Sequence, residues 1–224
     1  MSGKIRESAD LIVHFLMCMV GGFLGSYALL LRGNFGSAQT ANLIQLFIQF
    51  RYGDFFHIFL RIAACLLYIT MLSAAFFLAR WDRNKAKIIC ILLEAAGLIL
   101  VGLIPKDVDD LTAVMPLFAI TAFQWGNFNG VRGYSSPTLF STGNLRNCTV
   151  SWLEYLSGET ERLKRAIYFT ETLCFYHIGV AAGIWLTDAY GAHSVWICMI
   201  PLMCSFLTIL YEMNCKTNEG SICE

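Results

Sequence analysis

The chain has 224 residues, of which 57% are hydrophobic and 14% are charged, and its mean hydropathy is +0.59. Soluble domains carry about 25% charged residues, so the composition excludes a soluble enzyme, and the long apolar runs exclude a disordered chain. Sixteen basic residues balance sixteen acidic ones, which excludes the basic surface of a nucleic-acid-binding protein. We expect a single-domain, all-α membrane protein whose main partner is the lipid bilayer.

Six segments are candidate membrane spans, because a spanning helix needs about 20 largely apolar residues. In chain order they are Leu11–Leu31, Phe55–Leu78, Ile88–Ile104, Leu111–Phe128, Ala166–Leu186 and Val195–Tyr211. The first is too long for the apolar core of a signal peptide, and Glu7 and Asp10 precede it. We therefore expect it to be a retained helix.

Lys and Arg residues collect on one side of these spans, and cytoplasmic loops carry such an excess. That side holds twelve: Lys4, Arg6, Arg80, Arg83, Lys85, Lys87, Arg132, Arg146, Arg162, Lys164, Arg165 and Lys216. The other side holds three: Arg32, Arg51 and Lys106. The bias predicts an even number of spans with both termini in the cytoplasm.

Two polar segments between the spans resemble each other at an offset of 102 residues. Residues 36–45 read GSAQTANLIQ and residues 138–147 read TLFSTGNLRN. The matched positions are Thr40 with Thr142, Asn42 with Asn144, Leu43 with Leu145, and Gln45 with Asn147. Polar residues recur at helical spacing after each Asn, so each segment is expected to present one polar helical face.

This internal repeat divides the chain into residues 11–104 and 111–211, followed by a tail at 212–224. Each half has three spans, so the halves are expected to insert in opposite orientations, as in the inverted repeats of secondary transporters. Segments 40–50 and 142–152 are too short to cross a bilayer. Each is either a re-entrant half-helix with Thr or Ser at its N-cap, or an amphipathic helix at the membrane interface.

Several motifs together resemble the bacterial YoaK-like membrane proteins, the DUF1275 family of unknown function. They are GGFLGSY at 21–27, LRG at 31–33, AQTANL at 38–43, FQ at 123–124, Asn127, and STGNL at 141–145. The resemblance covers nearly the whole chain and implies about six spans in the bacterial inner membrane. The family usually has Asp where Gly25 stands and Gly where Ala41 stands. A role in ion or proton binding for that Asp therefore does not carry over.

Ionisable residues inside apolar spans are functional candidates, because they are costly to bury. Glu94 lies near the middle of the third span and would carry a proton or pair with a cation, unless it is a structural, hydrogen-bonded Glu. Arg61 and Glu171 come from opposite halves and could pair, although Arg61 is close enough to its helix end to snorkel. His177 is more typical of an interior structural histidine.

Carboxamides end the fourth span. Gln124 and Asn127 share a helical face and are expected to line a cavity, whereas Gly126 and Gly130 are expected to allow close helix packing. Together with the repeated segments, they define a predicted solute-binding set: Gln39, Thr40, Asn42, Gln124, Asn127, Thr142 and Asn144.

No catalytic motif and no zinc-ligand spacing occurs in the sequence, and six of its nine cysteines lie in apolar runs. We expect no enzymatic activity, cofactor or metal. The predicted function is a small secondary transporter or permease for a small polar or anionic solute, and a homo-oligomer is compatible with this. The alternative is a non-transporting scaffold or sensor, which tight packing around Asn42 and Asn144 would favour over a polar cavity.

Overall fold

The computed structural model describes residues 2–220, and within them the side chains of residues 7–215. This part of the chain is helical and contains no strand. The α-helices are α1 (Ser2–Arg32), α2 (Gln39–Tyr52), α3 (Phe55–Trp81), α4 (Arg83–Leu103), α5 (Asp110–Ala113), α6 (Met115–Asn127), α7 (Ser141–Leu156), α8 (Leu163–Tyr190) and α9 (Met199–Gly220). Two 3₁₀ helices are η1 (Thr160–Arg162) and η2 (Gly191–Cys198).

Four helical stretches are long and apolar enough to cross a membrane: Glu7–Arg32, Phe55–Trp81, Arg83–Leu103 and Thr160–Cys215. The first two contain the first two predicted spans, and the third contains the third predicted span except for its last residue, Ile104. The fourth contains the predicted fifth and sixth spans, which α8 and α9 form on either side of η2. The prediction of an all-α protein with several apolar helices of membrane-spanning length is therefore confirmed.

The predicted fourth span, Leu111–Phe128, is not one continuous helix. α5 ends at Ala113, and α6 has 13 residues. At 1.5 Å per residue, α6 is about 20 Å long, which is shorter than the ~30 Å hydrocarbon core. Pro116 explains the break, because a proline without an N–H group fits only the first turn of a helix. The prediction of a single spanning helix here was wrong.

The predicted C-terminal tail is also helical over most of its length. α9 continues without interruption past Tyr211 to Gly220. Residues 221–224, which include Cys223, lie outside the described part of the chain.

Short polar signals set the ends of the apolar helices. Gly53 ends α2 with a φ of 72°, a left-handed conformation that glycine adopts without strain. Asp54 then caps α3 by accepting a hydrogen bond from the backbone N–H of His57. Asp82 alone separates α3 from α4, and it accepts bonds from the N–H groups of Asn84 and Lys85. These two acidic caps allow each apolar helix to begin within two residues of the preceding one.

The core of the molecule lies along α1. This helix packs along α8 and α9, while α6 packs against α3 and α4. A Cβ atom at Gly22 would overlap the carbonyl oxygen of Tyr176, and one at Gly179 would overlap the backbone of Met19. The close approach of α1 and α8 therefore depends on glycine at these two positions.

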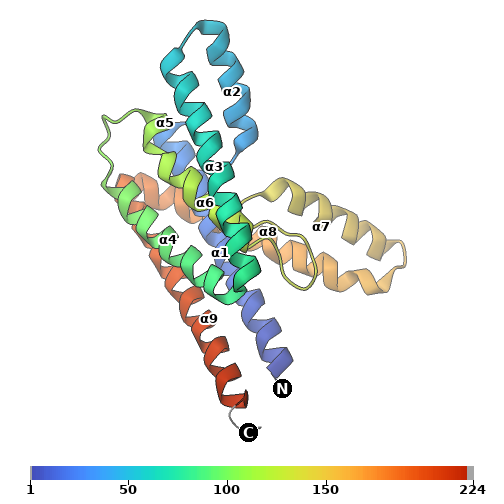
Figure 1. Ribbon diagram of the computed structural model, residues 1–224. Helices are drawn as coiled ribbons and strands as arrows, with labels where there is room; N and C mark the ends of the chain where they lie inside the picture. The colour runs from blue at the N-terminus through green and yellow to red at the C-terminus, as the bar shows by residue number, and fades with distance from the viewer. Residues whose placement is uncertain (1, 221–224) are drawn as a thin grey trace.

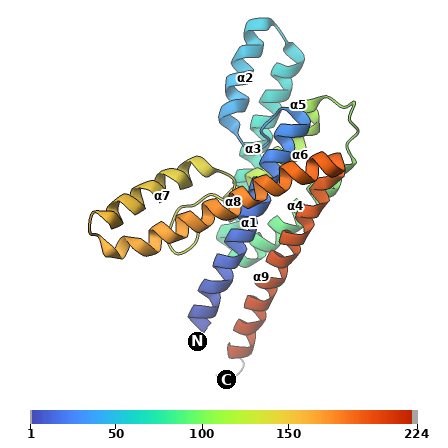
Figure 2. The same ribbon diagram turned by 180° about the vertical axis from the view of Figure 1, so that it is seen from behind.

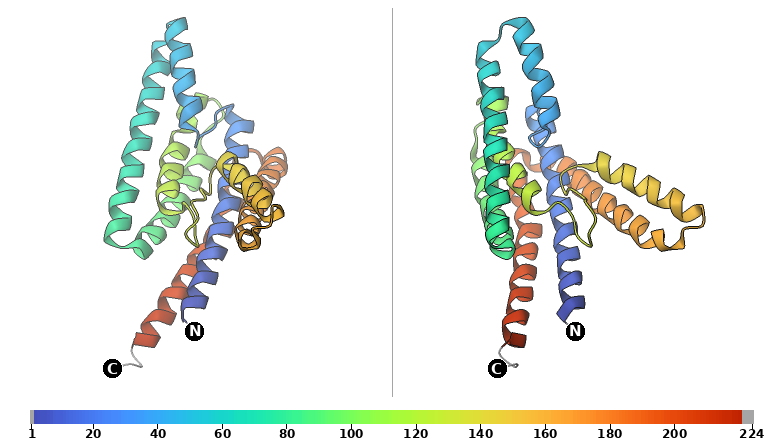
Figure 3. Two further views of the ribbon diagram at one scale, coloured as in Figure 1. Left: turned by 90° about the vertical axis from the view of Figure 1, so that its right-hand side faces the viewer. Right: turned by 45° about the vertical axis from the view of Figure 1, so that its right-hand side comes forward.

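Two helical hairpins project from this core in different directions (Figures 1 and 2). One is formed by α2 and α3, the other by α7 and α8, while α1 begins and α9 ends at the same end of the molecule (Figure 3). The outer surface of α3 is apolar, with Phe59 69%, Leu66 60% and Phe77 69% exposed. Such a surface is typical of a helix that faces lipid.

Candidate functional site

The repeated Thr-x-Asn-Leu segments form the first turns of α2 and α7. Asn42 is buried, and its side chain bonds only within the α2–α3 hairpin. Its Nδ2 donates to Gln39 Oε1 and to the carbonyl of Arg61, both at 3.1 Å, and its Oδ1 accepts from Arg61 Nη1 at 3.2 Å. Arg61 Nε also donates to Gln49 Oε1 at 2.9 Å. The hydrogen bonds between Asn42 and Arg61 thus hold α2 against α3.

Asn144 is equally buried but has different partners. Its Nδ2 donates to the carbonyls of Pro137 and Phe140, both at 2.9 Å, and its Oδ1 accepts from Ser136 Oγ at 2.9 Å. Asn144 therefore fixes the connection that leads into α7. Neither Asn144 nor Asn42 lines the cavities found in the described part of the chain, and a solute site between the two segments stays a prediction.

A buried histidine that sequence reasoning missed extends the contacts of Asn144. The Nε2 atom of His14 lies 3.1 Å from the Tyr168 hydroxyl, 3.3 Å from Thr172 Oγ1 and 3.5 Å from Ser136 Oγ. These contacts connect α1, α8 and the segment before α7. Only its position near the start of an apolar span could have drawn attention to His14 in the sequence.

The predicted capping role of Thr or Ser in these segments was wrong. Ala38 precedes α2 and Phe140 precedes α7, and neither provides a side-chain cap. Thr40 and Thr142 are exposed one residue inside their helices. Gln39 accepts from Asn42, while its Nε2 is buried without a hydrogen-bond partner.

The two carboxamides of α6 have different environments. Gln124 is fully buried, and its Nε2 donates to the carbonyl of Met17 at 3.0 Å and to Thr138 Oγ1 at 3.1 Å. It therefore ties α6 to α1 and lines no described cavity. Asn127 donates to the carbonyl of Phe123 at 2.9 Å, and its Oδ1 is buried without a partner at the wall of a cleft.

The candidate charged residues are not brought together. Arg61 bonds to carboxamides of α2, so the predicted pair with Glu171 is not formed; Glu171 is half-buried on α8. Glu94 is fully buried in α4, where its Oε1 accepts from Cys90 Sγ at 3.8 Å and its Oε2 has no hydrogen-bond partner. His177 is exposed and lies 2.8 Å from the carbonyl of Leu173, so it is not the interior histidine expected.

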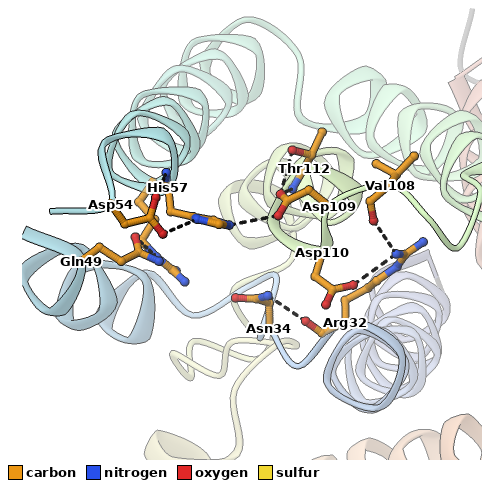
Figure 4. A network of polar contacts seen from close by, with 10 residues as sticks. Arg32, Asn34, Gln49, Asp54, His57, Val108, Asp109, Asp110 and Thr112 are labelled. Atoms are coloured by element: carbon orange, nitrogen blue, oxygen red, sulfur yellow. Dashed lines mark hydrogen bonds and ion pairs between the residues drawn. The ribbon is translucent and has the colours of Figure 1, made fainter. Parts of the chain in front are cut away.

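A second polar network, also missed, joins the tip of the α2–α3 hairpin to α5 (Figure 4). His57 Nδ1 lies 2.6 Å from Asp54 Oδ2, and its Nε2 lies 3.0 Å from Asp109 Oδ2. Hydrogen bonds from the backbone N–H and the ring of His57 lower the pKa of Asp54. Burial opposes ionisation of Asp109, but bonds from Thr112 and His57 outweigh it and lower the pKa of that carboxyl.

Arg32 anchors the same region to the end of α1 (Figure 4). Its guanidinium donates to the carbonyls of Pro105 and Val108 at 2.8 and 2.9 Å, and to Asp110 Oδ1 at 3.2 Å. The aspartates at 107, 109 and 110 had no role assigned from the sequence. The pairing of the last two with Arg32 and His57 depends on tertiary contacts across 50 to 80 residues of chain, which no local pattern reveals.

A cleft of about 690 Å³ lies between α3, α6 and the connection before α7. It is lined by Leu72, Phe76, Ala79, Arg80, Arg83, Trp125, Gly126, Asn127, Asn129, Ser135 and Pro137. Neither Arg80 nor Arg83 pairs with a carboxylate among the described residues. Of the predicted site residues, only Asn127 reaches this cleft.

The rest of the described part of the chain offers no comparable chemistry. No group of three or more His, Cys, Asp or Glu side chains there is arranged to hold a metal ion. The adjoining cavity of about 370 Å³ shares Arg83, Asn129 and Ser135 with the cleft. Its neighbouring acidic groups, Asp10 and Glu7, pair with Lys87 and Arg132.

Comparison with known proteins identifies a family but no characterised relative. No curated protein and no solved structure matches the chain. Residues 13–208 match a family described as protein of unknown function DUF1275. This match covers most of the chain, from within α1 to within α9. The protein therefore belongs to the DUF1275 family.

Proposed function

We propose that this protein is a small secondary transporter or permease of the bacterial inner membrane, with both termini in the cytoplasm and a small polar or anionic solute. The observation that carries the proposal is a repeated pattern of helix contacts. It relates α1, α2, α3 and α4 of the first half to α6, α7, α8 and α9 of the second.

The pairing of helices supports two halves of inverted topology. α1 packs on α8, and its counterpart α6 packs on α3. α1 also packs on α9, while α6 packs on α4, and each short helix packs on the helix that follows it. The contact between α4 and α9 joins two corresponding helices, so exchange of the halves maps this contact onto itself. Exchange of the halves by a two-fold rotation leaves this pattern unchanged, and such pseudo-symmetry is the basis of alternating access in many transporters.

We assign solute binding to the cleft that contains Arg80, Arg83 and Asn127. Two guanidinium groups without a carboxylate partner among the described residues favour an anion, and Asn127 Oδ1 offers a buried acceptor for an O–H or N–H group of the solute. Asn42 and Asn144 then have a structural role in each half, and the proposal assigns no catalytic residue.

One observation favours the alternative of a non-transporting scaffold or sensor. The carboxamide oxygens and nitrogens of Asn42 and Asn144 are all bonded within the protein, and both residues are buried. The repeated segments alone therefore provide no path for a solute, and the transport proposal depends on the cleft.

Uptake into proteoliposomes tests the proposal. We expect uptake above that of empty liposomes for at least one member of a panel of inorganic phosphate, acetate and alkanesulfonates of increasing chain length. The double variant Arg80→Gln, Arg83→Gln should lower this uptake at least tenfold. Arg146→Gln, an exposed arginine of α7 outside the cleft, serves as the matched control. Absence of uptake across the whole panel contradicts the transporter assignment.

A further inference from the structure

The cleft has an apolar end and a basic end arranged along one helix. Leu72, Phe76, Ala79 and Arg80 follow one another at helical spacing on α3, and Arg83 continues the series at the start of α4. From Leu72 to Arg80 the helix rises about 12 Å. Trp125 of α6 lines the opposite wall. The surface available to a ligand therefore changes from apolar to cationic over the length of a short alkyl chain.

The basic end lies where a membrane interface is expected. Trp81, the last residue of α3, is 75% exposed, and Lys85 Nζ stands 5.2 Å from the centre of its ring. Tryptophan and lysine at the end of an apolar helix are typical of the level of lipid headgroups. Arg80 and Arg83 flank this tryptophan, and Phe76 and Leu72 lie about one and two turns deeper in the helix than Arg80. The cleft thus has the polarity profile of one bilayer leaflet.

The charge at this end is available to a ligand. Arg80 stacks over the Phe76 ring, with its guanidinium carbon 5.7 Å from the ring centre, and neither this residue nor Arg83 pairs with a described carboxylate. The nearby acidic groups Asp10 and Glu7 have basic partners of their own. Arginine held against an aromatic ring remains free to bind a phosphate, sulfonate or carboxylate through its N–H groups.

We propose that this cleft binds a single-chain anionic amphiphile, with its acidic head at Arg80 and Arg83 and its alkyl chain against Leu72, Phe76 and Trp125. The inference rests on the proposed function, for which it names the substrate class. The cavity volume of about 690 Å³ is in the range of sites for drug-sized ligands and is too small for a two-chain phospholipid. Charge complementarity selects an anion over a cation or a neutral alcohol.

Quenching of Trp125 fluorescence measures this binding directly. The probe is a bromine-labelled dodecanesulfonate added to the full-length protein in nanodiscs of zwitterionic lipid. We expect saturable quenching that disappears in Trp125→Phe and persists in Trp185→Phe, a residue that is 74% exposed away from the cleft. Arg80→Gln with Arg83→Gln should weaken the apparent affinity at least tenfold, and Arg146→Gln should leave it unchanged.

Two further measurements define the chemical class. Each methylene removed from the alkyl chain should weaken binding about fourfold, from ~0.8 kcal/mol per buried methylene. Equal quenching by brominated dodecanol, or an unchanged affinity in the double arginine variant, would overturn the proposal. Equally effective competition by a two-chain anionic phospholipid would also overturn it, because the occupant would then be a bilayer lipid.

Binding and uptake can fail separately. Saturable quenching without uptake of any panel member leaves the amphiphile site in place and removes the transporter assignment. Uptake of short anions without binding of dodecanesulfonate retains the transporter and removes the amphiphile as its substrate class.

Discussion

At the scale of single residues, the two repeated asparagines have the same sequence context and different partners. Asn42 bonds to the next helix through Arg61, whereas Asn144 bonds to the backbone that precedes its own helix. The shared feature is therefore a buried carboxamide in the first turn of each short helix. Its hydrogen bonds hold the start of each short helix in place, but none of those described accepts from a backbone N–H group as the expected threonine cap would.

Asn144→Leu should destabilise the protein. The substitution nearly preserves volume but leaves Ser136 and the carbonyl of Pro137 without the partner they have now, at about 1 to 3 kcal/mol for each buried group. We expect a lower melting temperature in detergent, with dodecanesulfonate binding retained in the protein that remains folded. Asn147→Leu, on the same helix and without a described side-chain bond, is the control. An unchanged melting temperature together with lost ligand binding would instead place Asn144 in the solute path.

At the scale of elements, the connection before α5 holds the α2–α3 hairpin against the core. His57 lies between two carboxylates that come from either side of this contact, Asp54 and Asp109. Both ring nitrogens of His57 face carboxylate oxygens, and only the cationic imidazole donates to both. The contact should therefore depend on ionisation of the two aspartates.

The stability of this contact should fall in acid. The pKa of Asp109 is lowered from its ordinary value of 3.8, so its stabilising contribution is fully present above that unfolded-state value and is lost as the pH falls through the folded-state pKa. We expect the melting temperature of the wild-type protein to decline more steeply than that of Asp109→Asn as the pH falls below about 4. Asp107→Asn, exposed on the same connection, should keep the wild-type pH profile. Parallel profiles for Asp109→Asn and the wild type would show that this carboxylate contributes nothing.

At the scale of the whole molecule, the proposed inverted repeat relates α1 to α6, and their helix contacts correspond: α1 packs on α8 and α9, and α6 packs on α3 and α4. α1 begins and α9 ends at one end of the molecule, which is the arrangement that an even number of crossings produces (Figures 1 and 3). The short α6 is the element that departs from a simple six-helix pattern, because its counterpart α1 is much longer.

Labelling of single cysteines tests the topology. In a background without the nine native cysteines, Asp107→Cys and Glu161→Cys should react with a membrane-impermeant thiol reagent from opposite sides of the membrane. Both positions are exposed, one before α5 and the other between α7 and α8. Only Asp107→Cys should be labelled in intact spheroplasts. Labelling of both from the same side would rule out the inverted repeat.

The sequence by itself determined what depends on composition and local pattern. Apolar length predicts α1, α3, α4, α8 and α9, since lipid admits only helices with internally bonded backbone. Local signals such as Asp54 and Asp82 explain where α3 and α4 begin. The repeated Asn residues predict two related halves, and this stays a prediction.

Only the tertiary structure decided which polar groups meet. Gln124 was expected in a cavity and instead bonds to α1, while Arg61 was expected beside Glu171 and bonds to α2. The sequence gives no sign that His14 lies among α8 side chains, or that Arg80 and Arg83 border a cleft. Helical periodicity predicts which residues share a face. Which other helix that face packs against depends on how whole helices are oriented. Close contacts such as that of Gly22 with Tyr176 fix this orientation, and they form between segments far apart in the chain.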